Sequence, residues 1–161
     1  MSEPLPASAQ RVVDAAAGFG LVVEVREFPD GTRTADDAAR AVGVEVGQIV
    51  KTLVFSVDEA PVLALVSGKN RLDEAVLARL AGGEGATVGR VDANAVRTAT
   101  GFAIGGVPPF GHPEQLATFV DRDLLDYPVV WAAAGTPRHV FPIAPDDLVR
   151  VTHGSVADLA V

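Results

Sequence analysis

The pattern of hydrophobic and polar positions predicts short helices interleaved with strands and hairpins. Helices are expected where a polar capping residue precedes spaced apolar residues and glycine follows, and strands where β-branched and aromatic residues gather. No repeat or low-complexity tract interrupts this order. The predicted helices cover 9–17 (capped by Ser8), 35–42, 74–80, 93–98 and a short segment from Pro145; the predicted strands cover 21–28, 49–57, 62–67, 86–88, 117–121, 129–134 and 138–143.

This order of elements favours an α+β (mixed α/β) fold in which a curved mixed β-sheet, or pseudo-barrel, is surrounded by short helices. The strands at 49–57 and 62–67 are expected to form a hairpin because their connection is short. The nearly all-apolar strand at 129–134 is expected to be central, with 138–143 as its hairpin partner. A chain of 161 residues has the size of one domain, so we expect 1–161 to form a single domain.

A segment rich in glycine and proline, residues 100–112, is the most distinctive stretch of the chain. Its thirteen residues include four glycines and two prolines, which exclude a helix or a central strand. Apolar residues between these glycines and prolines predict that the loop packs on the core. Such a loop can offer backbone N–H groups to a ligand, because no side chains stand in the way. An ordinary structural turn is an equally good interpretation, since Gly-Pro clusters usually mark loops.

A lysine in a β-strand is the second candidate for function. The period of two places Lys51 in one row with Ile49, Leu53 and Phe55. An ammonium group in an apolar row is costly unless it has a partner or reaches water. Lys51 therefore either extends to solvent from an edge strand or points into a pocket, where it would meet a phosphate or a developing oxyanion.

The composition limits the classes of function. The net charge of −8 disfavours extensive contact with nucleic acid, because proteins that bind many phosphates are usually basic. Recognition of a single nucleotide end stays open. The absence of cysteine excludes disulfides and thiolate catalysis, and the three histidines lie far apart, so we expect no metal and no cofactor.

The sequence contains no indication of a membrane segment. No run approaches the roughly 18 apolar residues that a membrane span requires. The N-terminus also lacks the basic and apolar regions of a signal peptide. We therefore expect a cytoplasmic protein without a membrane partner.

Several motifs occur in order along the chain. The most specific feature is a pair of them, the strand with Lys51-Thr52 followed by the loop around Gly105-Gly106. The motifs are Thr34 with Ala38-Ala39, Ile49 to Phe55, Leu65 to Gly68, Arg71 to Asp73, Thr100 to Phe102, Gly105 to His112, Ala133 to Gly135, and Pro145 with Asp147-Leu148. Together they resemble the YbaK/prolyl-tRNA synthetase-associated editing domain family in its free-standing form, over residues 8–159.

The resemblance implies a mixed β pseudo-barrel surrounded by helices and a trans-editing activity. Such an aminoacyl-tRNA deacylase hydrolyses the ester of mischarged tRNA, chiefly tRNA(Pro) carrying a small wrong amino acid such as Ala or Cys. The implied partners are the acceptor end of tRNA, with its aminoacylated 3′-adenosine, and prolyl-tRNA synthetase. An alternative is a module that binds aminoacyl-tRNA or a nucleotide end without turnover, and a third is a purely structural domain.

The resemblance also assigns candidate residues. Lys51 matches the family's essential lysine, which holds the terminal adenosine phosphate or the substrate end, and the glycines match the loop that borders the aminoacyl pocket. In the cysteinyl-tRNA(Pro) subgroup a serine stands where this chain has Ala133, so cysteine specificity is in doubt. The catalytic candidates are Lys51, Gly101, Gly105 and Gly106, and the substrate-binding candidates are Thr34, Thr52, Phe102, Val107, Pro108, His112, Ala133, Gly135 and His139.

Ester hydrolysis requires a water, a proton acceptor and stabilisation of a tetrahedral oxyanion. No Gly-x-Ser-x-Gly motif or Ser/His/Asp set is evident in the sequence. We therefore expect a substrate-assisted route, with positioning by Lys51 and the glycine loop. Other residues are expected to be structural: Trp131 and Phe119 in the core, His153 on the surface, and Asp146-Asp147 at a helix start.

Overall fold

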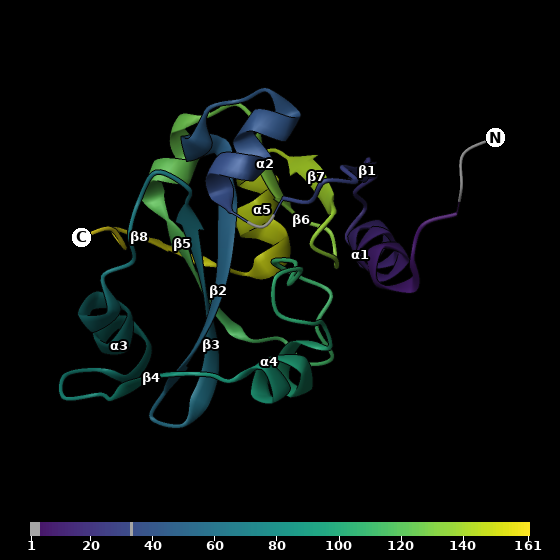
Figure 1. The fold of residues 1–161 in the computed structure, drawn as a ribbon. Helices are drawn as coiled ribbons and strands as arrows, with labels where there is room; N and C mark the ends of the chain where they lie inside the picture. The colour runs from purple at the N-terminus through teal and green to yellow at the C-terminus, as the bar shows by residue number, and fades with distance from the viewer. Residues whose placement is uncertain (1–3, 33) are drawn as a thin grey trace.

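Two β-sheets lie at the centre of the computed structural model, which describes residues 4–32 and 34–161 (Figure 1). One sheet has five strands in the order β4-β2-β3-β5-β8, and the other has three in the order β1-β7-β6. An isolated parallel bridge between Ile49 and Trp131 links them. The strands are β1 Arg26–Glu27, β2 Val50–Val57, β3 Ala60–Ser67, β4 Val88–Arg90, β5 Ala117–Asp121, β6 Val130–Ala133, β7 His139–Ile143 and β8 Ser155–Ala157.

The helices are α1 (Ala7–Gly18), α2 (Ala35–Val42), α3 (Glu74–Gly82), α4 (Ala93–Thr100) and α5 (Pro145–Thr152), with 3₁₀ turns at Val46–Gln48 (η1) and Arg122–Asp126 (η2). The side chains of Thr34, Asp73 and Asp92 accept backbone N–H groups at the starts of α2, α3 and α4, as the sequence predicted. The cap expected at Ser8 is wrong, because α1 begins earlier and Pro6 occupies the N-cap position.

The α+β fold class is confirmed, as is the β2–β3 hairpin, whose strands pair from Val50↔Ser67 to Val57↔Ala60. The five-stranded sheet is mixed: β3, β5 and β8 pair in parallel, whereas β2 is antiparallel to both of its neighbours. The three-stranded sheet is antiparallel. The described strands form two sheets rather than one closed barrel. β6 and β7 form the expected antiparallel hairpin.

Three strand predictions were wrong in detail. The strand expected at 21–28 is reduced to β1, which pairs with β7 only at Arg26 and Glu27, and Val22 is 96 % exposed. The strand expected at 86–88 lies at Val88–Arg90 instead. β6 stands at the end of the three-stranded sheet rather than in its centre. β6 is nearly all apolar because its residues are buried: Val130 and Ala132 belong to one core cluster, and Trp131 belongs to another.

The two faces of β2 pack against different parts of the core. Val50 and Val54 belong to the largest apolar cluster, while Leu53 and Phe55 pack with Leu77 of α3 in a second cluster. β2 therefore has the alternating faces that its sequence predicts. Buried apolar residues also anchor the loop at 100–112, as expected; the exception is Ile104, which is 61 % exposed, whereas Phe102, Val107 and Phe110 are buried.

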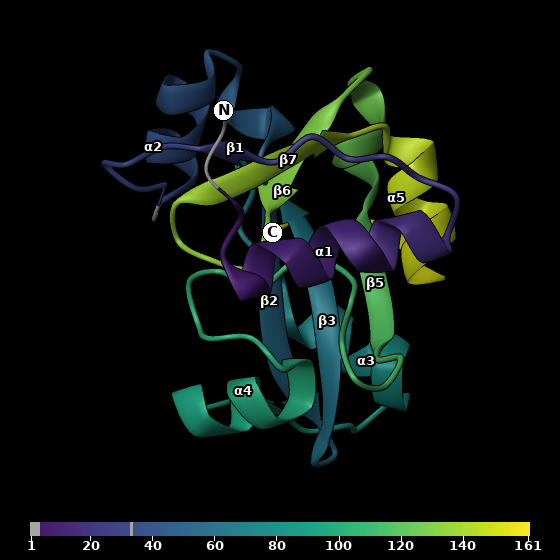
Figure 2. The ribbon, with the colours of Figure 1, turned by 90° about the vertical axis from the view of Figure 1, so that its right-hand side faces the viewer.

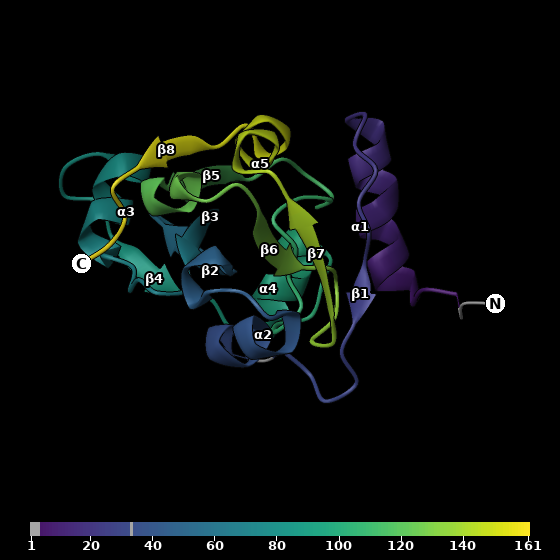
Figure 3. The same ribbon diagram turned by 90° about the horizontal axis from the view of Figure 1, so that it is seen from above.

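The helices enclose the sheets from several sides. α1 lies outside the two sheets; in Figure 2 it runs below β1 and β7 and crosses in front of β2 and β3. Viewed from above, α1 and α3 occupy opposite ends of the molecule (Figure 3). α2 lies near the beginning of β2, and α4 lies toward its far end. None of the helices in the described ranges combines the length and apolar character needed to span a bilayer.

Candidate active site

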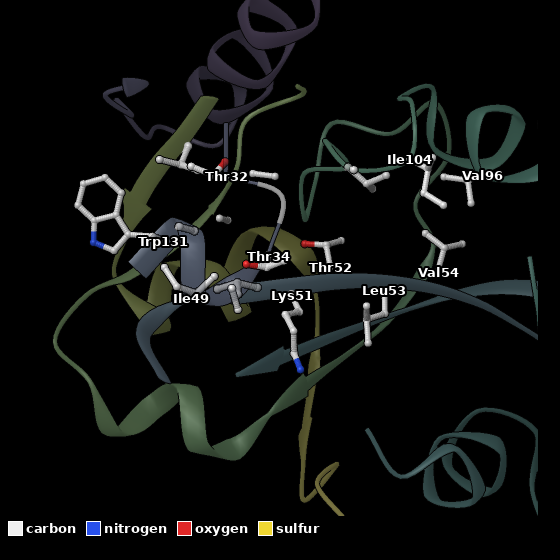
Figure 4. Close-up of a pocket in the computed structure, with 18 of the residues that line it drawn as sticks. Thr32, Thr34, Ile49, Lys51, Thr52, Leu53, Val54, Val96, Ile104 and Trp131 are labelled. Atoms are coloured by element: carbon white, nitrogen blue, oxygen red, sulfur yellow. The ribbon is translucent and has the colours of Figure 1, made fainter. Parts of the chain in front are cut away.

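A cavity of about 610 Å³ follows the side of β2 that has no complete strand partner. β4 pairs with β2 only between Phe55 and Val57, so the preceding residues of β2 form an open edge toward the cavity. The start of α2, the loop at 104–107 and strand β6 complete the walls (Figure 4). A volume of this size is typical of small-molecule sites.

The open edge of β2 presents peptide groups to this cavity. Successive peptide groups of a strand point to opposite sides. The carbonyl of Ile49 accepts from Gly68 at 2.7 Å on the β3 side, while the N–H of Asp58 donates to Thr87 at 2.9 Å on the β4 side. By this alternation the N–H and C=O groups of Thr52, which precedes the β4 pairing, point away from β3. They are available to hydrogen-bond a ligand in the cavity.

Thr52 also directs its side chain into the cavity (Figure 4). Its Oγ1 atom is buried and has no hydrogen-bond partner in the described chain. Buried polar atoms are nearly always paired, and an unpaired one costs free energy. A ligand that hydrogen-bonds Thr52 would remove this cost, so Thr52 is a strong candidate for substrate contact.

Lys51 borders the same cavity from the other face of β2. Its side chain is half-buried, and its ammonium group donates a hydrogen bond to the backbone carbonyl of Asn70. Burial lowers the pKa of Lys51, and the negative charge of Asp121 opposes that effect. The ammonium group is thus directed toward Asn70 and not toward the glycine loop, in contrast to the sequence-based picture of a lysine facing that loop.

The glycines of the 100–112 loop have different roles. Gly105 lines the cavity with φ +94°, a left-handed conformation that favours glycine. Gly106 is buried behind it, and a Cβ atom there would lie 2.6 Å from Cα of Thr136. Gly101 ends α4 in a left-handed conformation and lies outside the cavity lining; its carbonyl accepts from Arg11 at 2.8 Å.

Only some of the other residues that the sequence predicted for the site line the cavity. Thr34, Val107 and Ala133 line the cavity. Phe102, Pro108, Gly135 and His139 are buried and do not line it; His139 Nε2 lies 3.3 Å from Oε2 of Glu27.

His112 lines a separate cavity of about 280 Å³, and its Nε2 atom contacts the Pro108 carbonyl at 2.8 Å. Burial lowers the pKa of His112. The contact with Pro108 opposes this effect, and the positive charge of Arg11 adds to it. Because His112 lines this separate cavity and not the larger one, a contact between His112 and substrate stays a prediction.

Trp131 and Arg90 are among the cavity residues that the sequence did not assign to the site. Trp131 is buried, as expected of a core residue, yet it also lines the cavity, and the guanidinium of Arg26 lies 4.9 Å from its ring centroid. Arg90 lines the cavity from the end of β4. Neither stands in a motif, and only the pairing of Phe55 with Arg90 brings this arginine to the edge of β2.

The chemistry of the cavity is that of a binding and positioning site. Three threonine hydroxyls and the cations Lys51 and Arg90 are its polar side chains. Among the described residues that line it, none carries a carboxylate, an imidazole or a thiol. The lining can therefore orient a polar or anionic ligand, but it offers no conventional general base.

Comparison with known proteins shows the family of the chain. A family model described as an aminoacyl-tRNA editing domain matches residues 29–151, a range that includes β2, the glycine loop and β6. The chain therefore belongs to the aminoacyl-tRNA editing domain family.

Three relatives illustrate the range of the family. EbsC of Enterococcus faecalis, a candidate Cys-tRNA(Pro)/Cys-tRNA(Cys) deacylase, is 28% identical over 127 residues, covering 78% of this chain and 76% of EbsC. A crystal structure of a candidate trans-editing enzyme for prolyl-tRNA synthetase is 50% identical, with a TM-score of 0.92 and coverage of 98% of this chain and 99% of the other. A proline–tRNA ligase of Streptococcus sanguinis is 33% identical over 94 residues, or 58% of this chain but only 15% of the ligase.

Proposed function

We propose that this protein is a trans-editing deacylase that hydrolyses the ester of mischarged aminoacyl-tRNA. The observation that carries the proposal is the cavity along the open edge of β2, which Lys51, Thr52 and Gly105 border in a chain of the editing family. Its volume of about 610 Å³ accommodates an aminoacyl group together with part of a terminal nucleoside.

The protein contributes binding and positioning to the reaction. The edge peptide groups and the Thr52 hydroxyl hold the aminoacyl group, and the cations Lys51 and Arg90 attract the phosphate that precedes the terminal adenosine. The lining provides no conventional base, so the ribose hydroxyl next to the ester, or the amino acid itself, helps to activate the attacking water. Positioning of this kind lowers a barrier by up to about 7–11 kcal/mol.

The walls favour a small amino acid side chain. Ala132, Ala133, Val50, Val54 and Val107 are among the lining residues, and these are small or branched apolar residues. Ala133 offers no hydroxyl to a thiol, so we expect alanine to be removed faster than cysteine.

The single-domain organisation of residues 1–161 and a cytoplasmic location stay predictions.

The proposed substrate is tRNA(Pro), contacted at its acceptor end. The relatives support this choice, because the description of one refers to prolyl-tRNA synthetase and another is itself a proline–tRNA ligase. Prolyl-tRNA synthetase is the corresponding candidate partner, which would deliver mischarged tRNA to a free-standing editing domain.

Deacylation assays test this proposal directly. Wild-type protein, Lys51→Ala and Lys69→Ala are incubated with Ala-, Cys- and Pro-tRNA(Pro). Lys69 is a matched control because it is exposed, lies over the Tyr127 ring and does not line the cavity. We expect fast release of alanine by wild type and by Lys69→Ala, and a loss of tenfold or more in Lys51→Ala. Equal rates for Lys51→Ala and wild type would remove Lys51 from the site.

A second candidate function is a module that binds aminoacyl-tRNA without turnover. The lack of a conventional base in the cavity lining favours it. The same assays distinguish the two: tight binding of charged tRNA that is recovered intact would support the binding module and contradict the deacylase.

A further inference from the structure

A buried carboxylate that does not line the cavity is connected to Lys51 through Asn70. Asp121 is only 1 % exposed. Its Oδ2 atom accepts from Ser67 N at 3.0 Å and from Asn70 Nδ2 at 2.9 Å, and its Oδ1 atom accepts from Asp123 N at 3.0 Å. All three donors are neutral, so these hydrogen bonds leave the negative charge without a counter-ion. A buried charge of this kind is costly unless an opposite charge lies near.

Three basic residues are candidates for that opposite charge, and they differ in their contacts and exposure. Arg122, next in sequence, is exposed and pairs instead with Asp158 at 3.0 Å. Lys69 is exposed and packs on Tyr127. Lys51, half-buried on β2, is the cation whose pKa Asp121 raises against the effect of burial. Lys51 is therefore the charge partner of Asp121, at a distance beyond direct ion-pair contact.

Asn70 connects the two groups. Its side-chain amide donates to Asp121 at 2.9 Å and to Asp123 at 2.7 Å. Two carboxylate acceptors require the amide nitrogen, so the orientation of this side chain is fixed. The backbone carbonyl of the same residue accepts a hydrogen bond from the Lys51 ammonium. The carboxylates thus anchor the residue that anchors the lysine.

We propose that Asp121, acting through Asn70, is the positioning residue that fixes the Lys51 ammonium group at the cavity edge, and so makes it competent to bind the phosphate end of the substrate. An ammonium group has three N–H donors, and Asn70 takes one of them. The structure assigns no partner within the described chain to the other two, which are available to an anionic oxygen. The inference rests on the proposed function, because it specifies how Lys51 is prepared for that role.

The charged groups around Lys51 come from several elements. Asp121 belongs to β5, Asp123 belongs to η2 and contacts Asn70, and Arg90 reaches the cavity from β4. Lys69 lies on the same turn as Asn70. Of these, Asp121 is the one that raises the pKa of Lys51, while burial lowers it. Removing the charge of Asp121 therefore lowers the pKa of Lys51 further.

Nuclear magnetic resonance titration of the Lys51 side chain tests the physical part of the proposal without any substrate. The variants are Asp121→Asn and, as a matched control, Asp123→Asn, which makes the same change two residues away on the other acceptor of the Asn70 amide. We expect the Lys51 pKa to fall clearly more in Asp121→Asn than in Asp123→Asn. An unchanged pKa in Asp121→Asn would overturn the proposal.

A double-mutant cycle on kcat/KM tests the functional part, with uncatalysed ester hydrolysis subtracted. Asp121→Asn is expected to lose about tenfold in the wild-type background and almost nothing further in a Lys51→Met background, because the two residues act as one unit. Equal losses in both backgrounds would mean that Asp121 has a structural role only. If Asp121→Asn fails to fold, Asn70→Ala replaces it, since it keeps the carbonyl and removes the link to Asp121. A wild-type protein that hydrolyses no mischarged tRNA would contradict the proposed function, while the titration still decides the role of Asp121.

Discussion

The buried hydroxyl of Thr52 has a cost to stability and a proposed contact with substrate, and the two can be separated by mutation. The buried Oγ1 atom lacks a hydrogen bond in the unliganded protein. Thr52→Val removes this atom and keeps the shape, so we expect the free energy of unfolding to rise by about 1 kcal/mol. The same change removes the proposed hydrogen bond to substrate, so kcat/KM should fall about five- to tenfold. Urea denaturation and deacylation kinetics measure the two effects.

Thr52→Ser is the control for this prediction, because it keeps the hydroxyl and removes the methyl group. It should retain most of the activity and lose stability. If Thr52→Val destabilises the protein, the hydroxyl has a partner in the folded chain. If the kcat/KM of Thr52→Val equals that of wild type, the hydroxyl does not contact the substrate.

His112 should make stability depend on pH. Burial lowers its pKa below the ordinary value of about 6.5, so the unfolded chain binds this proton more tightly than the folded chain. Stability contributed in this way is present above pH 6.5 and is lost as the pH falls toward the lower folded-state pKa. Denaturation of wild type and His112→Gln between pH 8 and 5 should show a flatter profile for the variant. The exposed His153→Gln should leave the profile unchanged.

At the scale of elements, the glycine loop is held by steric fit as well as by backbone conformation. A Cβ atom added at Gly106 would lie only 2.6–2.7 Å from backbone atoms of Thr136, whereas at Gly105 the nearest atom would be 3.8 Å away. Gly106→Ala should therefore destabilise the fold by about 3 kcal/mol. Gly105→Ala suffers only the strain of its positive φ, about 1–2 kcal/mol.

Gly43→Ala separates strain from steric fit. Gly43 has a similar φ of +86°, lies in the left-handed helical region with ψ 37°, and has nothing within 4 Å of an added Cβ. In urea denaturation it should match Gly105→Ala and lose less stability than Gly106→Ala. Equal losses for all three variants would show that Thr136 moves to accommodate the methyl group.

The elements that the sequence predicted best depend on local interactions. Thr34, Asp73 and Asp92 begin helices because each caps the turn that follows it. The failure at 21–28 has a non-local cause, since β1 exists only where β7 is within pairing distance. The period of two identified the face of Lys51, but the direction of its ammonium group depends on Asn70, nineteen residues away. Likewise, nothing near Trp131 in sequence indicates that it meets Ile49 at the cavity.

At the scale of the whole molecule, the net charge of −8 limits how the protein can bind tRNA. A broad contact with the phosphate backbone would require many cations on one surface, and the affinity would fall steeply with salt. Contact with the acceptor end alone involves two or three phosphates. A plot of log affinity against log salt concentration should therefore have a slope no steeper than about −2.

A shortened substrate tests the same idea independently of salt. A mischarged minihelix that contains only the acceptor stem and the 3′ end should be deacylated with a kcat/KM within about threefold of that for full-length tRNA, because under the proposed function the cavity receives only the aminoacylated end. Uncharged minihelix is the control for binding without the ester. A steep salt slope together with loss of activity on the minihelix would place a second tRNA contact elsewhere on the protein, and would require a basic surface that its overall charge disfavours.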